Sequence, residues 1–353
     1  MFNYKYPHNL KKVKRLRIEE TRNLTKGLRL DRNERVENWD KNIKNVFLKA
    51  PNYFFSIYPD LSKLYKKIAK FDNIKKDQLL VTSGIDGGIK TFFETFINKR
   101  DLVGVVKPTY AMYQVYAKVF DSRIEEISYI NKRFNFEKFE KFIKKKPKVF
   151  FLPNPNQPIE DNFSLKNLEI IAKKLLKINC VLFVDEAYYL FGQKSAKDLI
   201  KKYNNIVVAR TFSKGFGLPS IRLGYLISNY KMIDMLSKSR LAHETNSLSS
   251  FIASYYLDNF TIIKKYINEI KNTRKFLLKE LKKLSIKAYA EKGNFMLIEL
   301  TNPKQVKNVV NRLKKELIYV KGPWSQPYDN CFSITIGPKK KMEIFLKLIK
   351  KIT

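Results

Sequence analysis

Acidic residues, histidine and cysteine are scarce in this chain. Its 353 residues include 33 Asp and Glu against 70 Lys and Arg, with 2 His and 2 Cys. Two cysteines, Cys180 and Cys331, cannot form a disulfide framework, and Cys180 before the apolar run VLFV is typical of a buried hydrophobic residue. Neither the cysteines nor His8 and His243 show CxxC or HExxH spacing, so we expect no metal site.

Long apolar runs are also absent. No segment approaches the roughly 18 uncharged apolar residues of a membrane span. The first residues, MFNYKYPHNLKK, lack the continuous apolar stretch of a secretory signal. We therefore expect a cytoplasmic protein without a membrane partner. Hydrophobic residues make up 44% of the chain, which excludes long disorder, and the length fits one large or two medium domains.

The surplus of basic residues gives a formal net charge of +37, which first suggests nucleic-acid binding. The lysines, however, are spread along the whole chain, with only short clusters at 144–146 and 339–341. We interpret most of them as solvated helix faces, because no nucleic-acid motif accompanies them. Steering of a small anionic substrate is an alternative, and a nucleic-acid surface is less favoured.

One lysine-rich segment, 256–284, shows the helical pattern clearly. Its apolar residues recur at spacings of three and four, which predicts a helix with one buried stripe. The predicted stripe comprises Ile262, Ile263, Tyr266, Ile267, Ile270, Phe276, Leu277 and Leu281.

Between about residues 78 and 228, short apolar runs alternate with longer amphipathic stretches. This alternation predicts an α/β domain with a mostly parallel sheet covered on both faces. Residues 246–353 resemble a smaller α+β domain, and the irregular residues 1–50 are expected to pack with it. We therefore divide the chain into an N-terminal segment 1–50, a large domain 51–245 and a small domain 246–353.

Two motifs of the large domain follow strands at the positions where α/β sheets bind ligands. In VTSGIDGGIKTFFETF a helix is expected to begin near Asp86 or Gly87, and its free amides would favour a phosphate. A plain strand-to-helix turn is the alternative. In VLFVDEAYYLF, Asp185 ends a buried strand and Tyr188 follows. The carboxylate could pair with a protonated ring nitrogen, but it could also cap a helix or bind Mg²⁺.

Two further motifs complete the set. In NIVVARTFSKGFGLPSIRLGYLIS, Lys214 could form a Schiff base if burial lowers its pKa, while Ser213 and Arg222 could hold a phosphate. In FFLPNPNQPIEDN, amide side chains at a strand end could bond a ring oxygen, or they could simply shape the turn.

Taken in this order, the four motifs resemble those of the fold-type I aminotransferases that use pyridoxal 5'-phosphate (PLP), and most closely the histidinol-phosphate aminotransferase branch. The segments YPD, SGIDGGI, KPTYAMY, PNPNQP, DEAYY, RTFSKGFGLPSIRLGY and GNFMLIEL all fall in family order, so the resemblance covers nearly the whole chain. It implies the PLP-transferase fold, with PLP as the cofactor.

The resemblance also implies roles for individual residues. Lys214 looks like the lysine that binds PLP and moves the proton, and Asp185 looks like the partner of the pyridine nitrogen. Tyr188 looks like the donor to the ring oxygen, and Tyr110 like the aromatic stacked on the ring. Tyr58 is similar to a tyrosine that reaches the partner subunit's cofactor, which implies a homodimer. The implied phosphate cup comprises Gly84, Ile85, Asp86, Ser213 and Arg222.

The sequence departs from the family pattern at two places. Where the family has a second Asn that contacts the ring oxygen, this chain has Gln157, and Asn156 is the other candidate. Where the family has an arginine that clamps the substrate carboxylate, the chain has Ser333, and serine cannot replace a bidentate guanidinium. Other substrate contacts are then expected from Arg32, Arg35, Lys321 and His243, although a lone histidine is more often structural.

We therefore predict a PLP-dependent aminotransferase that moves an amino group between a small acidic amine and a keto acid or aldehyde. The expected acid group is a phosphate, a phosphonate or another acid distant from the nitrogen. A PLP-dependent decarboxylase of a phosphorylated amino acid is the alternative, and a basic nucleic-acid-binding protein is a remote one.

Overall fold

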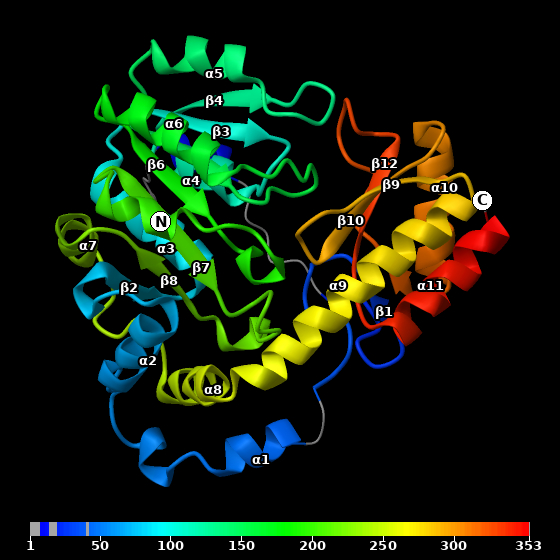
Figure 1. The fold of residues 1–353 in the computed structure, drawn as a ribbon, viewed down its shortest axis with the longest axis horizontal. Coiled ribbons are helices and arrows are strands. Elements are labelled where there is room, and N and C mark those ends of the chain that lie inside the picture. Colours follow the sequence, from blue (N-terminus) through cyan, green and yellow to red (C-terminus); the bar gives the residue numbers. More distant parts are fainter. Residues whose placement is uncertain (1–7, 14–19, 40–41, 353) are drawn as a thin grey trace, which may run out of the picture.

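The computed structural model describes residues 8–13, 20–39 and 42–352 (Figure 1). Its centre is a seven-stranded sheet in which β8 alone runs antiparallel to the other strands. Residues such as Ile206, Val207 and Val208 are completely buried, because helices cover both faces of the sheet. The strand order is β2 (Leu79–Thr82), β8 (Gly224–Ile227), β7 (Ile206–Thr211), β6 (Val181–Asp185), β5 (Val149–Pro153), β3 (Leu102–Lys107) and β4 (Arg123–Ser128).

Two separate apolar clusters cover the two faces of this sheet. Phe92, Phe93 and Phe151 belong to the cluster beneath α3 (Gly84–Phe96), α4 (Met112–Val119) and α7 (Tyr230–Ser237). The other cluster lies beneath α2 (Ser62–Asp72), α5 (Phe136–Ile143), α6 (Leu165–Leu176) and α8 (Ser247–Asp258). The six 3₁₀ helices of the described residues are η1 (His8–Lys12), η2 (Asn52–Phe55), η3 (Lys76–Gln78), η4 (Tyr189–Phe191), η5 (Ala196–Lys201) and η6 (Pro219–Ile221).

The C-terminal part builds a three-stranded antiparallel sheet of its own. Its strand order is β12 (Cys331–Thr335), β10 (Phe295–Glu299) and β9 (Lys287–Tyr289), and it packs with α9 (Phe260–Lys283), α10 (Pro303–Lys315) and α11 (Lys339–Ile352). Helix α9 runs from the large domain across to this sheet, as Figure 1 shows in yellow. Helix α8 follows residue 246 but packs against α2 and α1 (Asn42–Leu48) on the large-domain side.

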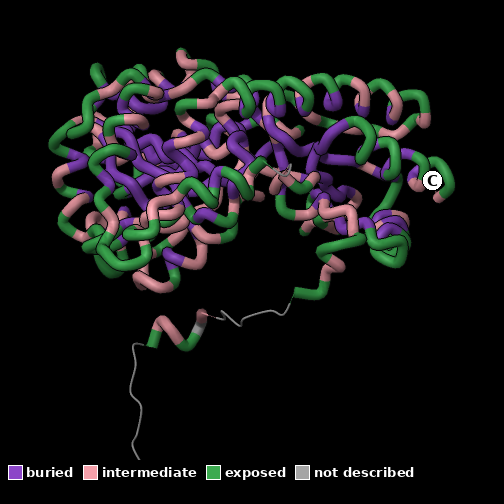
Figure 2. Tube along the Cα trace, turned by 90° about the horizontal axis from the view of Figure 1, so that it is seen from below, coloured by how far each residue is buried: buried purple, intermediate pink, exposed green. Residues whose placement is uncertain are grey.

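The lysine-rich helix α9 has the predicted buried stripe with one difference. Ile263, Ile270 and Leu277 are completely buried, and lysines such as Lys264 and Lys265 are exposed. Ile262 was expected in the stripe, but it is 40% exposed because it precedes the buried face by one position. The alternation of buried and exposed residues along this helix is visible in Figure 2.

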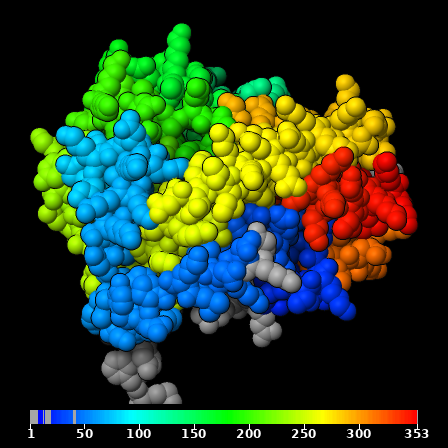
Figure 3. All heavy atoms as spheres, turned by 60° about the horizontal axis from the view of Figure 1, so that its bottom comes forward, coloured from blue at the N-terminus to red at the C-terminus, as the bar shows by residue number. Residues whose placement is uncertain are grey.

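The N-terminal segment joins the small domain through backbone pairing. Strand β1 (Leu28–Arg29) pairs in parallel with β11 (Ile318–Tyr319), and the amide of Asn33 donates to the Thr335 hydroxyl at 2.9 Å. Figure 3 shows these residues, in dark blue, against the red and orange C-terminal elements. The same segment also reaches the large domain, where the Trp39 indole donates to the Gly217 carbonyl at 2.9 Å. The predicted segment 1–50 includes 1–7, 14–19 and 40–41, which lie outside the described residues.

Two kinds of feature are absent from the described part of the chain. No helix there is both long and apolar enough to traverse a lipid bilayer. Within the same ranges, no three acidic, histidine or cysteine side chains gather in a way that could hold a metal ion.

Candidate active site

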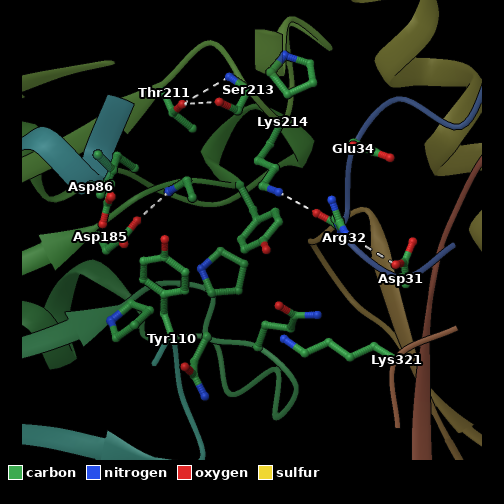
Figure 4. A pocket seen from close by; sticks show the side chains of 18 of the residues that line it. Asp31, Arg32, Glu34, Asp86, Tyr110, Asp185, Thr211, Ser213, Lys214 and Lys321 are labelled. Atoms are coloured by element: carbon green, nitrogen blue, oxygen red, sulfur yellow. Dashed lines mark hydrogen bonds and ion pairs between the residues drawn. The ribbon is translucent and has the colours of Figure 1, made fainter. Parts of the chain in front are cut away.

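A cavity of about 720 Å³ lies at the carboxyl ends of the parallel strands, where the large domain, the N-terminal segment and the small domain meet (Figure 4). We call its two sides the large-domain wall and the outer wall. The large-domain wall comprises Ile85, Asp86, Tyr110, Tyr113, Pro153, Pro155, Asn156, Gln157, Asp185, Ala187, Tyr188, Thr211, Ser213, Lys214, Pro219 and Arg222. The outer wall comprises Asp31, Arg32, Glu34, Val320, Lys321 and Gly322.

One end of the large-domain wall is built to hold an anion. Helix α3 begins at Gly84, two residues before the expected start, and presents the amides of its first turn, which have no partners within the helix. Gly84 has φ +69°, and a Cβ there would stand 2.9 Å from an Arg222 guanidinium nitrogen. The Arg222 guanidinium lies 3.5 Å from the Ser213 hydroxyl. The predicted phosphate-cup residues are therefore close together.

Lys214 follows β7 and extends into the cavity, as Figure 4 shows. Its Nζ donates to the Arg32 carbonyl at 2.7 Å. Burial lowers the pKa of the Lys214 amine to about 8, the Glu34 carboxylate opposes this change, and the charges of Lys321 and Arg222 reinforce it. A substantial fraction of the amine is therefore neutral near physiological pH, which a nucleophilic lysine requires.

Asp185 ends β6 and is only 6% exposed. Burial raises the pKa of its carboxyl to about 6, while hydrogen bonds from the Tyr113 hydroxyl and the Ala187 amide oppose that rise. The Tyr113 hydroxyl donates to Asp185 Oδ2 at 2.6 Å. Tyr113 was not singled out from the sequence, although its place three residues after Tyr110, on the first turn of a helix, could have indicated it.

Two tyrosines, Tyr110 and Tyr188, line the cavity together with Lys214 and Asp185. Tyr110 is 47% exposed and lines the cavity, and its ring meets the Tyr113 ring edge to face at 5.9 Å. The Tyr188 hydroxyl accepts a hydrogen bond from the Asn33 amide at 2.8 Å, so its own proton is available to donate. Asn33, from the N-terminal segment, is a second residue that the sequence reasoning missed.

The two amides of the PNPNQP loop differ in their bonding. The Asn156 side-chain NH₂ donates to the carbonyls of Pro108 at 2.9 Å and Ile159 at 3.4 Å, and its oxygen accepts from the Thr109 hydroxyl at 2.8 Å. Asn156 is thus engaged in shaping the loop. Gln157 lines the cavity, and its side chain has no hydrogen-bond partner among the described residues. Gln157 is therefore the amide that can donate into the cavity.

The outer wall carries charges of both signs. Asp31 and Glu34 are held by the Arg22 guanidinium at 3.1 and 2.8 Å. The Arg32 side chain is 56% exposed and pairs with Glu20 at 3.2 Å. These carboxylates and Arg22 were also missed from the sequence, because only the folded segment brings them to the cavity.

Lys321 reaches the outer wall from the small domain. Its Nζ lies 4.7 Å from the centre of the Trp324 ring, and it forms no ion pair with a described carboxylate. Burial of its ammonium end lowers the pKa of Lys321, although the residue as a whole is exposed. Lys321 is bridged to Ser333 by backbone hydrogen bonds of 3.0 and 2.8 Å.

Three of the predicted substrate residues do not line the cavity. The Arg35 guanidinium lies over the rings of Trp39 and Tyr266 at 4.2 and 4.1 Å. Ser333 is 1% exposed, and its hydroxyl has no hydrogen-bond partner among the described residues. The His243 ring stacks on the Tyr58 ring with the ring centres 4.7 Å apart, and Tyr58 is 81% exposed.

The fold and the lysine–aspartate cavity define a fold-type I PLP-dependent enzyme. The solved structures of histidinol-phosphate aminotransferases from Sinorhizobium meliloti, in complex with pyridoxal-5'-phosphate, and from Clostridium acetobutylicum have this fold. They superpose with TM-scores of 0.84 and 0.80 at 20% and 22% identity, over 92% of this chain in both cases and 91% and 98% of those chains.

Sequence relatives narrow the class. The histidinol-phosphate aminotransferase of Clostridium novyi (strain NT) is 30% identical over 346 residues, 96% of both chains. The enzyme of the same name from Thermoanaerobacter sp. (strain X514) is 33% identical over 294 residues, 81% of this chain and 82% of its own. The profile of the family "Aminotransferase class I and II" matches residues 23–349. The chain belongs to this family and is a PLP-dependent aminotransferase, which confirms the predicted fold, enzyme class and cofactor.

The residues present fit PLP. The close approach of Arg222 to Gly84, where a Cβ would fill the space, leaves a cradle for a phosphate at the start of α3. The buried Asp185 lines the same cavity as Arg222, Lys214 and Tyr188. PLP supplies an aldehyde that joins amines and a ring that accepts electrons. Asp185 could hold the ring nitrogen, Tyr188 and Gln157 the ring oxygen, and Lys214 the aldehyde carbon.

Proposed function

We propose that this aminotransferase takes its amino group from a small amine that carries a phosphate, phosphonate or other acid group distant from the nitrogen, and passes it to a keto acid or aldehyde. The observation that carries the proposal is Lys321, a cation in the outer wall with no carboxylate partner among the described residues. An unpaired ammonium at a partly dry cavity wall favours an anionic ligand group.

The place of Ser333 supports the same substrate class. Backbone pairing sets Ser333, where the resemblance implies an arginine, beside Lys321, whose ammonium is the neighbouring cation that lines the cavity. An ammonium binds a phosphate as a point charge, whereas a planar guanidinium holds a carboxylate with two parallel hydrogen bonds. Loss of the planar clamp therefore disfavours α-amino acids more than amines with a distant phosphate. Histidinol phosphate, the substrate named in the relatives, is one amine without a carboxylate.

In the proposed reaction the proton is moved by Lys214. Because its pKa is lowered to about 8, the amine can take the proton from the substrate carbon that bears nitrogen and release it again within the same cavity. Tyr188, held by Asn33, orients its hydroxyl toward the same space. Asp185 stabilises positive charge on the ring side.

A homodimer is part of the proposal. Leu48, Phe55 and Tyr58 are 83%, 73% and 81% exposed, and they lie close together along α1, η2 and the following residues. Apolar residues gathered in this way mark a protein interface, and the Tyr58 of a second copy would then approach the cavity. Analytical ultracentrifugation should give twice the chain mass, and Phe55→Glu should shift the protein toward monomer. The cytoplasmic location stays a prediction.

The test of the substrate class is a comparison of matched amines with the PLP-loaded enzyme. Histidinol phosphate and 2-aminoethylphosphonate are each compared with the same amine lacking the acid group, and glutamate serves as an ordinary α-amino acid. Loss of the cofactor's visible absorption band in a single turnover reports amino transfer. We expect the acidic member of a pair to react at least about tenfold faster, since a charged hydrogen bond contributes about 1.5–3 kcal/mol.

Three results would contradict the proposal. One is reaction restricted to glutamate and other α-amino acids. Another is equal rates for the acidic and non-acidic members of both pairs. The third is release of CO₂ from a phosphorylated amino acid without formation of a keto product, which would indicate a decarboxylase.

A further inference from the structure

Tyr113 is a buried phenol in the large-domain wall of the cavity. It lies on the first turns of α4, is 0% exposed, and stacks on Phe151 with the ring centres 5.0 Å apart and an interplanar angle of 24°. Its hydroxyl donates to Asp185 Oδ2 at 2.6 Å, and burial raises the pKa of Tyr113 well above its ordinary value. Burial therefore keeps the phenol a neutral hydrogen-bond donor near neutral pH.

Asp185 receives one hydrogen bond on each oxygen. The Ala187 amide donates to Oδ1 at 3.0 Å and Tyr113 donates to Oδ2. Because each carboxylate oxygen can accept more than one bond, both keep a lone pair for a ligand in the cavity. The two donors come from different elements, so together they fix the plane of the carboxylate.

The other charged and titratable groups around Asp185 do not take the place of Tyr113. Glu186 next to it opposes its ionisation and Lys214 favours it, in both cases less than the two hydrogen bonds do. Asp86 lines the same cavity and is drawn beside Asp185 in Figure 4. The neighbouring phenols, Tyr110 and Tyr188, both have raised pKa values, chiefly through burial, and are neutral.

Glu186 shows what a different partner does to the adjacent carboxyl. The Arg210 guanidinium donates to Glu186 Oε2 at 3.0 and 2.9 Å, and the Ala196 amide donates to the other oxygen at 2.6 Å. A guanidinium cancels the charge of the carboxylate it binds. A phenol stabilises the charge of Asp185 and leaves it available to a cation in the cavity.

We propose that Tyr113 is a positioning residue that keeps Asp185 ionised and aimed at the cofactor's ring nitrogen. This role of Tyr113 concerns the cofactor side of the cavity and does not depend on which amine is the substrate. Without the phenol, burial of Asp185 would be less well compensated, and the carboxyl would hold its proton to a higher pH. A protonated Asp185 no longer attracts a protonated ring nitrogen, so cofactor affinity would fall.

Tyr113→Phe tests this, because it removes one oxygen and keeps the stacked ring. The dissociation constant of PLP is measured by equilibrium dialysis between about pH 6 and pH 8.5. For the wild type, affinity should decline as the pH falls through about 6, the pKa of Asp185. In the variant this decline should begin at higher pH, with affinity at about pH 6 weaker by about tenfold for each unit by which the pKa rises. Near pH 8.5 the two proteins should agree within about threefold.

The matched control is Tyr65→Phe. Tyr65 likewise donates to a buried carboxylate, Glu244, at 3.0 Å, but it lies outside the cavity. Its loss should lower the melting temperature without moving the pH at which PLP affinity declines. The PLP phosphate and Lys214 titrate in all three proteins, so only a difference between them reports Asp185.

Two outcomes would overturn the proposal. One is a Tyr113→Phe protein that is less stable yet shows the wild-type pH dependence of PLP affinity, which would indicate a structural role alone. The other is a Tyr113→Phe protein whose PLP affinity is weakened by the same factor at every pH between about 6 and 8.5, which would show that the phenol does not act through the charge of Asp185.

Discussion

The two walls of the cavity hold their polar residues in different ways. On the large-domain wall, Asp185 and Ser213 are 6% and 8% exposed and sit at the ends of strands whose neighbours are completely buried. On the outer wall, Arg32 and Lys321 are exposed long side chains on irregular segments. A rigid sheet edge can hold a cofactor in one geometry, whereas flexible cations on loops suit recognition of a variable substrate. The cofactor chemistry is therefore expected to depend on the first wall and the substrate choice on the second.

The largest effect is expected on the large-domain wall. Lys214→Arg keeps the positive charge, but a guanidinium stays protonated and can neither join an aldehyde nor carry the proton. We expect transamination to fall by about 10⁴-fold, measured as amino transfer from the best donor. Lys107→Arg, at a salt bridge to Glu126 outside the cavity, is the control and should retain full activity. Residual transfer within about tenfold of the wild type would show that another residue moves the proton.

A smaller, substrate-dependent effect is expected on the outer wall. Lys321→Met removes the ammonium and keeps most of the apolar stem. We expect kcat/KM for the acidic amine to fall by about tenfold and that for the matched non-acidic amine to change little. Lys339→Met is the control, because Lys339 also lies over an aromatic ring, that of Phe276, but outside the cavity. An equal loss for both amines would remove the distinction between the two walls.

The smallest expected effect is an electrostatic coupling between the two walls, from Lys321 to Lys214. The charge of Lys321 helps to lower the pKa of Lys214 to about 8, so Lys321→Met should raise it by a fraction of a unit. Capture of free PLP by the protein requires the neutral amine, so its rate should rise with pH and level off above about pH 8 in the wild type. In the variant the midpoint should move upward. An unchanged midpoint would mean that the two walls are electrostatically independent.

Much of the large domain could be predicted from its sequence. Apolar runs marked the central strands, and Lys214, Asp185 and Tyr188 stood directly after them. The carboxyl ends of parallel strands lie at one edge of a sheet. The alternating pattern of strands and helices therefore predicted that these three side chains lie close together. Tyr113 escaped notice because its role depends on the direction of a buried hydroxyl, which a tyrosine in an amphipathic helix does not reveal.

The outer wall could be predicted much less well. Arg35 was expected to contact substrate, but it lies between Trp39 and Tyr266, while its neighbours Asp31, Arg32 and Glu34 line the cavity. Residues in an irregular segment have no repeating pattern that tells which of them point inward. Only the pairing of β1 with β11 sets their direction.

The sequence by itself determined the apolar runs of the central strands, the lysine and aspartate that meet in the cavity, and the absence of an arginine at Ser333, because each is written in a local motif beside a strand. The tertiary structure decided which charges face the substrate. Lys321, Arg32 and the Arg22 cluster come from opposite ends of the chain, and they meet only because parallel pairing of β1 and β11 lays the N-terminal segment against the small domain. Although basic residues are in surplus, Lys321 is the one cation among the described residues of the outer wall that forms no ion pair.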